Sequence, residues 1–187
     1  LCTQHNVLLV ADEIQSGLGR SGKLFAVDWE GVRPDVVTIG KALSGGFYPV
    51  SAVLADESVM GVSKPGDHGS TFGGNPIAAA VGQAALKVLT EDGLIENANA
   101  QGEYLMGRLR RIESPHVKEV RGRGLLIGVE LYPEAGGARR FCEALKEQGL
   151  LCKETHDNVI RFAPPLVISR EDIDWALERI EPVLLME

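Results

Sequence analysis

The sequence predicts an α/β fold in two parts, a mostly parallel sheet over residues 1–90 and a smaller α+β domain over residues 91–187. Short continuous apolar runs at residues 7–10 and 36–39 are typical of strands that are covered on both faces of a parallel sheet. The stretch between these runs exceeds the roughly dozen residues that a parallel crossover requires. After residue 93, strands and helices no longer alternate strictly, which favours the α+β class.

One further strand and a helix complete the first part. A third apolar run, at residues 50–55, is interpreted as a strand. Asn75 directly precedes Pro76, which is typical of a helix start, because Asn caps the free amides and Pro fits the first helical position. We expect this helix to run to about residue 90.

The second part begins with a long amphipathic helix at residues 93–112. Glycines 122 and 124 interrupt the two strands that follow this helix. The remaining predicted elements are strands at 117–120 and 125–131, a helix at 138–148, strands at 150–153 and 159–162, and a helix at 170–185.

Composition excludes several classes of partner. The chain has 187 residues, of which 44% are hydrophobic and 24% charged, as in ordinary globular proteins. Its net charge is −7 and it has no basic stripe, which argues against nucleic acid or an anionic membrane surface. No apolar run approaches the ~18 residues that a membrane-spanning helix needs. We therefore expect neither nucleic acid nor a membrane as a partner.

The cysteines, the histidines and the first residue add further expectations. The 3 cysteines lack C-x-x-C spacing and the 4 histidines are far apart. We therefore expect a reducing compartment, no disulfide framework and no metal site. The chain opens at Leu1 and enters an apolar run almost at once, without a targeting segment. We expect it to be part of a longer protein, with the cytoplasm as the default location.

The segment from Gly17 to Gly22 spells G-x-G-x-x-G, and together with Lys23 it is similar to a phosphate-binding loop. A dinucleotide fingerprint leaves a strand directly and enters a helix. Here several residues separate the strand from Gly17, and residues 24–27 lack a helical start. Leu24 also stands where a phosphate-binding loop needs Ser or Thr to hold magnesium. We interpret the segment as a flexible glycine loop.

An acid and an amine are predicted to lie at one edge of the sheet. Asp12 ends the first strand and Lys41 follows the second, and open α/β sheets bind ligands at the carboxyl ends of their strands. A salt bridge is the alternative for two such residues alone. Small residues at 40–46 leave Lys41 open to a flat ligand, and residues 68–74 offer hydroxyls and amides before a helix, as phosphate sites do. Together they match the requirements of pyridoxal phosphate (PLP) chemistry.

Four motifs, in this order, resemble those of the class III, fold-type I PLP-dependent aminotransferases: Asp-Glu-Ile-Gln at 12–15, Gly-Lys-Ala-Leu-Ser-Gly-Gly at 40–46, Gly-Ser-Thr-Phe-Gly-Gly-Asn-Pro at 69–76 and Arg-Phe-Ala-Pro-Pro-Leu at 161–166. Within this family, the ornithine aminotransferases are most similar at residues 46–52, 65–71 and 153–156. The similarity covers essentially the whole chain. It implies that residues 1–90 are the C-terminal part of a PLP-binding large domain, which is incomplete here, and that a small C-terminal domain follows.

The resemblance implies catalytic and cofactor-binding roles at three positions. Lys41 matches the lysine that carries the cofactor and later moves a proton between substrate and cofactor. Asp12 matches the carboxylate that keeps the pyridine nitrogen protonated, so that the ring accepts electrons. Gln15 matches a side chain near the phenolic oxygen of the ring, with a turn residue as the alternative.

The resemblance also implies binding roles in the later motifs. Thr71 matches a phosphate ligand of the neighbouring subunit's site, which implies a homodimer with shared active sites. Ser70 beside it is a second candidate ligand, with a structural turn as the alternative. Arg161 matches the arginine that clamps the carboxylate of glutamate or 2-oxoglutarate, a task suited to a planar guanidinium. An exposed strand arginine is the alternative there, and Arg20 is assigned no role beyond surface or structural pairing.

The implied reaction is transfer of the δ-amino group of ornithine to 2-oxoglutarate, giving glutamate semialdehyde and glutamate. An acetylornithine or other ω-amino-acid aminotransferase would share every residue named above. A truncated or split segment that is inactive on its own is a further alternative, because the family's N-terminal half is absent. That half would bring the main phosphate loop and the aromatic ring that stacks on the cofactor, so we expect the chain to need it.

Overall fold

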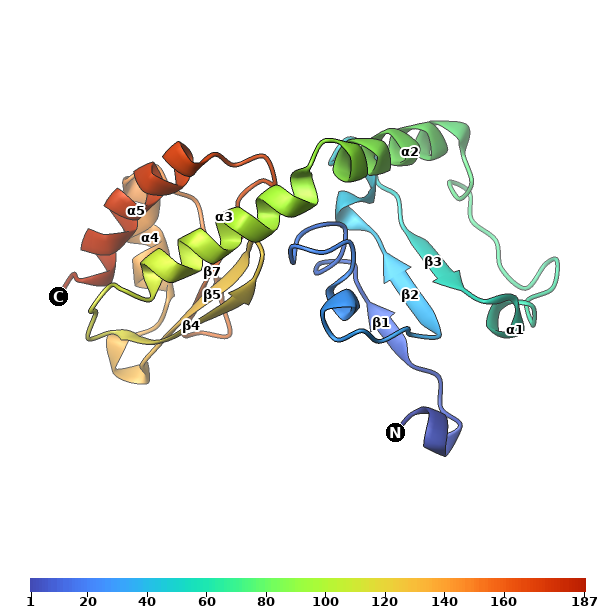
Figure 1. The fold of residues 1–187 in the computed structure, drawn as a ribbon, viewed down its shortest axis with the longest axis horizontal. Helices are drawn as coiled ribbons and strands as arrows, with labels where there is room; N and C mark the ends of the chain where they lie inside the picture. The colour runs from blue at the N-terminus through green and yellow to red at the C-terminus, as the bar shows by residue number, and fades with distance from the viewer. The chain divides into compact units, whose positions relative to one another are not determined.

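The computed structural model describes residues 1–187, and their contacts divide the chain into two units (Figure 1). The first unit contains Leu1–Gly19 and Lys23–Leu94. The second contains Arg20–Gly22 and Ile95–Glu187. The sequence predicted a border after residue 90 and did not predict that a short segment of the glycine loop joins the second unit. That the units are the large and small domains of a whole protein stays a prediction.

The first unit is built on a three-stranded sheet in the order β1-β2-β3. β1 (Val10–Asp12) pairs parallel with β2 (Val36–Ile39), as predicted, and β2 pairs antiparallel with β3 (Ala52–Ala55). The parallel pair places the carboxyl ends of β1 and β2 at the same edge. The helices of this unit are the 3-10 helices η1 (Thr3–His5), η2 (Ala26–Trp29) and η3 (Lys41–Ser44), and the α-helices α1 (Glu57–Met60) and α2 (Pro76–Glu91).

The apolar run that leads into β1 is exposed within residues 1–187, so the coverage on both faces that the pattern predicts is not present in this part of the protein. Val7, Leu8 and Val10 are 58%, 56% and 56% exposed. The strand also begins later than predicted, because β1 spans Val10–Asp12 and overlaps the predicted run at residues 7–10 only at Val10. Coverage depends on other elements, and within residues 1–187 these side chains remain in contact with solvent.

The predicted helix start at Asn75 is confirmed. The Asn75 side chain accepts a hydrogen bond from the Ala78 amide at 2.8 Å, and Pro76 is the first residue of α2. α2 packs against η3 at Gly82. A Cβ added at Gly82 would lie 3.7 Å from the Leu43 carbonyl oxygen, which is an ordinary van der Waals distance. The helix therefore supports the turn that contains Lys41.

The second unit is an α+β structure with an antiparallel sheet in the order β4-β5-β7-β6. Its elements are α3 (Leu94–Leu109), β4 (Val117–Arg123), β5 (Leu126–Leu131), η4 (Pro133–Ala135), α4 (Arg139–Glu147), β6 (Lys153–Thr155), β7 (Val159–Phe162) and α5 (Arg170–Leu184).

The strand predicted at residues 150–153 begins later than expected, at Lys153. The Leu150 amide donates to the Leu145 carbonyl at 2.9 Å in the turn that ends α4. This amide is therefore not available for strand pairing, and the sheet begins only after the turn.

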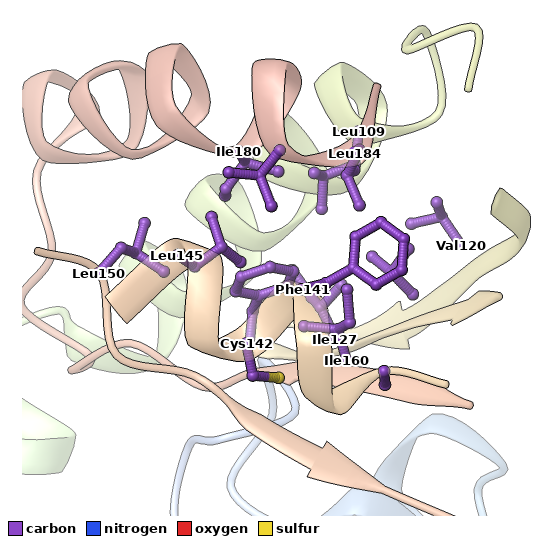
Figure 2. Packing of buried hydrophobic residues seen from close by; sticks show 14 of the residues in the cluster. Leu109, Val120, Ile127, Phe141, Cys142, Leu145, Leu150, Ile160, Ile180 and Leu184 are labelled. Carbon is purple, nitrogen blue, oxygen red and sulfur yellow. The ribbon is translucent and has the colours of Figure 1, made fainter. Parts of the chain in front are cut away.

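Helices and strands of the second unit enclose one hydrophobic core (Figure 2). Alternate residues of β5 and β7 are buried, among them Ile127, Val129 and Ile160, while Phe141 enters the core from α4. Figure 2 shows the labelled side chains filling the space between the helices and the strands. Burial of this kind is the main favourable term in folding, at about 25 cal/mol per Å² of apolar surface. None of the helices in the structure is both long and apolar enough to cross a membrane.

Candidate active site

Asp12 is held in a defined orientation at the carboxyl end of β1. It lies opposite Thr38 in the parallel register, and the Thr38 hydroxyl donates to Asp12 Oδ1 at 3.3 Å. The Ile14 amide donates to the same oxygen at 3.1 Å. One side-chain hydroxyl and one main-chain amide thus orient the Asp12 carboxylate, and because Asp12 is exposed it stays open to a ligand.

Lys41 begins η3 shortly after β2, the strand that pairs with β1. Its φ is 42°, in the left-handed region that residues with a side chain rarely adopt. Such a backbone costs about 1–3 kcal/mol and is found preferentially at functional sites. Gly40 packs against Ile14, since a Cβ added at Gly40 would lie 3.6 Å from that side chain. The segments that follow β1 and β2 are therefore in contact, as the parallel pairing predicted.

The loop before α2 supplies hydroxyl groups next to a helix N-terminus. The Ser70 hydroxyl accepts a hydrogen bond from the Gly73 amide at 2.9 Å and closes a tight turn. The turn role that was the alternative for Ser70 is therefore present. Thr71 is exposed in the same loop. The first amides of a helix favour a bound anion, because they carry partial positive charge and lack partners within the helix.

Lys41 and this loop line one hollow of the first unit, with a volume of about 1190 Å³. Its lining includes the basic residues Lys41 and His68 and no aspartate or glutamate, which suits an anionic ligand. Asp12, Gln15 and Thr71 belong to the same unit but are not among the lining residues. Hydroxyl groups in the lining come from Ser44, Tyr48, Ser51 and Ser70.

Arg161 lies in the second unit, on β7. Its neighbours Ile160 and Phe162 are buried in the core, so Arg161 faces the other side of the sheet, as the alternation predicted. Its partner on β5 is Gly128, which has no side chain to cover the guanidinium. Arg161 is half-buried there. Gln15 of the first unit is exposed in the turn after β1.

Glu13 is a buried carboxylate for which the sequence alone predicted no role. Its side chain accepts hydrogen bonds from the Ala26 amide at 3.0 Å, the Val27 amide at 2.9 Å and the Ser16 hydroxyl at 2.7 Å. Only 2% of Glu13 is exposed. It thereby ties the crossover between β1 and β2 to the end of β1, next to Asp12. The sequence signal that could have indicated this role is the position of Glu13 at the end of the predicted strand, directly after Asp12.

The glycine loop that follows serves packing. A Cβ added at Gly17 would lie 2.9 Å from the Glu13 Cβ, so only glycine fits at this point of the loop. The loop leads into the short 3-10 helix η2 (Ala26–Trp29), and no α-helix begins there. The geometry of a dinucleotide-binding fingerprint is therefore not met.

Comparison with known proteins decides the family. The pattern that defines the class-III aminotransferases matches residues 1–184. The chain belongs to this family. An ornithine aminotransferase of Halalkalibacterium halodurans is 62% identical over 98% of the chain, and that of Bacillus subtilis is 59% identical over the same share. The chain spans only 46% and 45% of those two proteins, that is, less than half of their length.

Solved structures of aminotransferases share this backbone. The ornithine aminotransferase of Plasmodium yoelii has a TM-score of 0.94 at 48% identity, over 98% of this chain and 49% of its own. An acetylornithine aminotransferase of Elizabethkingia anophelis has a TM-score of 0.92, also at 48% identity, over 98% of this chain and 47% of its own. The fold is thus that of PLP-dependent aminotransferases, of which this chain contains a part.

Proposed function

We propose that this class-III aminotransferase chain forms part of an enzyme that uses PLP to transfer the δ-amino group of ornithine to 2-oxoglutarate. The products are glutamate semialdehyde and glutamate. The observation that carries the proposal is the hollow that Lys41 shares with the Ser70 loop, next to a parallel strand pair that ends in Asp12. The 62% identity to an ornithine aminotransferase supports the choice of amino donor.

The residues of the first unit fit the cofactor. When bound, PLP supplies an electron-accepting ring that stabilises negative charge on the substrate carbon. Lys41 would hold the cofactor covalently through its amine. Once the amine of the substrate has displaced it, the freed Lys41 amine would take the proton from the substrate carbon and return it. The Asp12 carboxylate keeps a proton on the pyridine nitrogen, and Gln15 orients the ring through its phenolic oxygen.

Three further residues bind anionic groups in this proposal. The hydroxyls of Ser70 and Thr71 hold phosphate, helped by the partial positive charge at the N-terminus of α2. Thr71 serves the site of a second subunit, so the enzyme is a homodimer with shared sites. Arg161 binds the carboxylate of 2-oxoglutarate or glutamate with a bidentate guanidinium. Full activity requires the remaining part of the enzyme, and the 3 free cysteines support a cytoplasmic location.

Covalent trapping tests the central assignment. The full-length enzyme is incubated with PLP, reduced with borohydride and digested, and the peptides are mapped by mass. We expect a phosphopyridoxyl group on Lys41 only, and its loss in Lys41→Arg, while the control Lys23→Arg keeps the label. A label on another lysine of the unaltered enzyme would overturn the assignment.

Acetylornithine is the second candidate amino donor, because an acetylornithine aminotransferase matches this chain with a TM-score of 0.92. Steady-state kinetics of the full-length enzyme separate the two donors. We expect kcat/KM for ornithine to exceed that for N-acetylornithine by at least about tenfold, which corresponds to about 1.4 kcal/mol in transition-state binding. The opposite order would replace ornithine by its acetylated form.

A further inference from the structure

The Arg20 guanidinium is placed to hold two loops of the second unit. Its Nη1 donates to the carbonyl oxygens of Leu125, at 3.1 Å, and Pro164, at 2.5 Å. The Leu125 amide donates back to the Arg20 carbonyl at 3.0 Å. These partners are 105 and 144 positions away in sequence, so one side chain joins three distant parts of the chain.

Glycines allow the main chain around Arg20 to approach this unit closely. A Cβ added at Gly124 would lie 2.5 Å from the Gly22 nitrogen and 2.7 Å from the Arg20 carbonyl oxygen. A Cβ added at Gly102 of α3 would lie 2.0 Å from the Gly124 carbonyl oxygen. All three glycines are buried. Backbone therefore lies directly on backbone here, and the segment Arg20–Gly22 has little freedom to shift.

The same packing removes water from the guanidinium. Burial lowers the pKa of Arg20 from its ordinary value. A desolvated charge is costly unless it is hydrogen-bonded, so its carbonyl partners stay in place together with it. Lysine at this position would keep the charge but would lose the planar set of donors that can reach both loops.

Pro164 belongs to the segment that leaves β7 directly after Arg161 and Phe162. A second tether holds the same segment further on, where the Asn97 side-chain amide donates to the Leu166 carbonyl at 2.7 Å. We infer that Arg20 is a positioning residue for Arg161, fixing the exit of β7 so that the Arg161 guanidinium meets a substrate carboxylate in a productive orientation. This inference rests on the proposed role of Arg161.

The two substrates make the inference testable. In 2-oxoglutarate, the carbon that reacts is bonded directly to a carboxylate, whereas in ornithine the reacting carbon lies at the far end of the chain from its carboxylate. An arginine that clamps a carboxylate beside the reacting carbon therefore acts on the oxo acid. Misplacement of Arg161 weakens the binding of 2-oxoglutarate and leaves the binding of ornithine largely unchanged.

The experiment compares Arg20→Met and Arg20→Lys in the full-length enzyme, with Arg140→Met as the matched control. Arg140 also donates to two main-chain carbonyls of the second unit, those of Ala135 at 2.8 Å and Glu187 at 2.9 Å. We expect KM for 2-oxoglutarate to rise by about tenfold to a hundredfold in Arg20→Met, the range that a small misplacement of a binding group produces. KM for ornithine should change by less than about twofold, a split that loss of folded enzyme does not produce.

The outcomes separate this inference from the proposed function. Arg20→Lys should show the same split to a smaller degree, and it decides the question if Arg20→Met does not fold. Equal changes in both KM values, or the same split in Arg140→Met, would overturn the inference. Arg161→Met tests the underlying role of Arg161. If KM for 2-oxoglutarate does not rise in this variant, the assignment of Arg161 fails. If it rises in Arg161→Met but not in the Arg20 variants, only the positioning role of Arg20 is rejected.

Discussion

The two units of the chain are stabilised in different ways. The second unit has a closed core in which Phe141, Val129 and Ile160 are fully buried. In the first unit, fewer apolar residues are buried, and large ones such as Leu8 and Phe47 are 56% and 82% exposed. The crossover of the first unit is instead tied down by the hydrogen bonds of one buried carboxylate, Glu13.

This difference places most of the exposed large apolar side chains on the first unit. Exposed apolar surface of this kind is typical of a region that binds further protein. Lys41 and Asp12 stand on the unit with that surface, and Arg161 stands on the unit with the closed core. The proposed cofactor chemistry is therefore placed on the less self-sufficient unit, and the proposed carboxylate site on the more self-sufficient one.

The largest expected effect comes from dividing the chain between Leu94 and Ile95. A peptide of residues 95–187, which is the second unit without Arg20–Gly22, should unfold cooperatively on heating, because all residues of its hydrophobic core lie within it. A peptide of residues 1–94 should bind a hydrophobic dye and aggregate, since its apolar strands stay exposed. Circular dichroism melts and dye fluorescence check both. Cooperative melting of residues 1–94 alone would remove the contrast between the units.

A matched pair of substitutions compares the two units at single side chains. Phe141→Ala should lower the free energy of unfolding by about 3–5 kcal/mol, because it leaves a cavity in a fully buried site. Phe47→Ala removes the same atoms from a residue that is 82% exposed, and should change stability by no more than about 0.5 kcal/mol. Urea denaturation of the whole chain measures both values. Similar losses would mean that Phe47 is covered in solution.

The smallest expected effect concerns the polar anchor of the first unit. In Glu13→Gln, the NH2 group of the amide replaces one carboxylate oxygen that accepts hydrogen bonds. This NH2 donor then faces a donor group of the protein. We expect a loss of about 1–3 kcal/mol and faster hydrogen exchange at the Ala26 and Val27 amides. Glu91→Gln is the control, because its side chain is 60% exposed in a loose ion pair with Lys87. Unchanged exchange at these two amides would show that the crossover is held by other contacts.

The elements that the sequence predicted best are those with a local signal. The strand at residues 159–162 was predicted from its own alternation and has the expected bounds. The start of α2 at Asn75 and Pro76 follows from capping chemistry within a few residues. Which elements cover Val10 could not be predicted from its own apolar run, because coverage depends on residues far away in the sequence. The late start of β6 depends on how α4 ends.

The features of the candidate site also differ in how far the sequence could predict them. Parallel pairing of two apolar runs was enough to predict that the segments after Asp12 and before Lys41 lie at one edge of the sheet. The carbonyl partners of Arg20 were not predictable, because they lie 105 and 144 positions away in sequence. The left-handed backbone of Lys41 has no signal in the local sequence, since lysine rarely adopts it. The roles of Gln15, Thr71 and Arg161 stay predictions.

The placement of Arg20–Gly22 has a consequence for how the protein can be divided. The chain passes between the units at Gly19–Arg20, again at Gly22–Lys23 and finally at Leu94–Ile95. A protease that cuts only the last link would leave the units covalently joined through the glycine loop. For the same reason, neither unit can be exchanged between related enzymes as one uninterrupted segment. A segment of residues 1–94 would include Arg20–Gly22 of the second unit, and a segment of residues 95–187 would lack them.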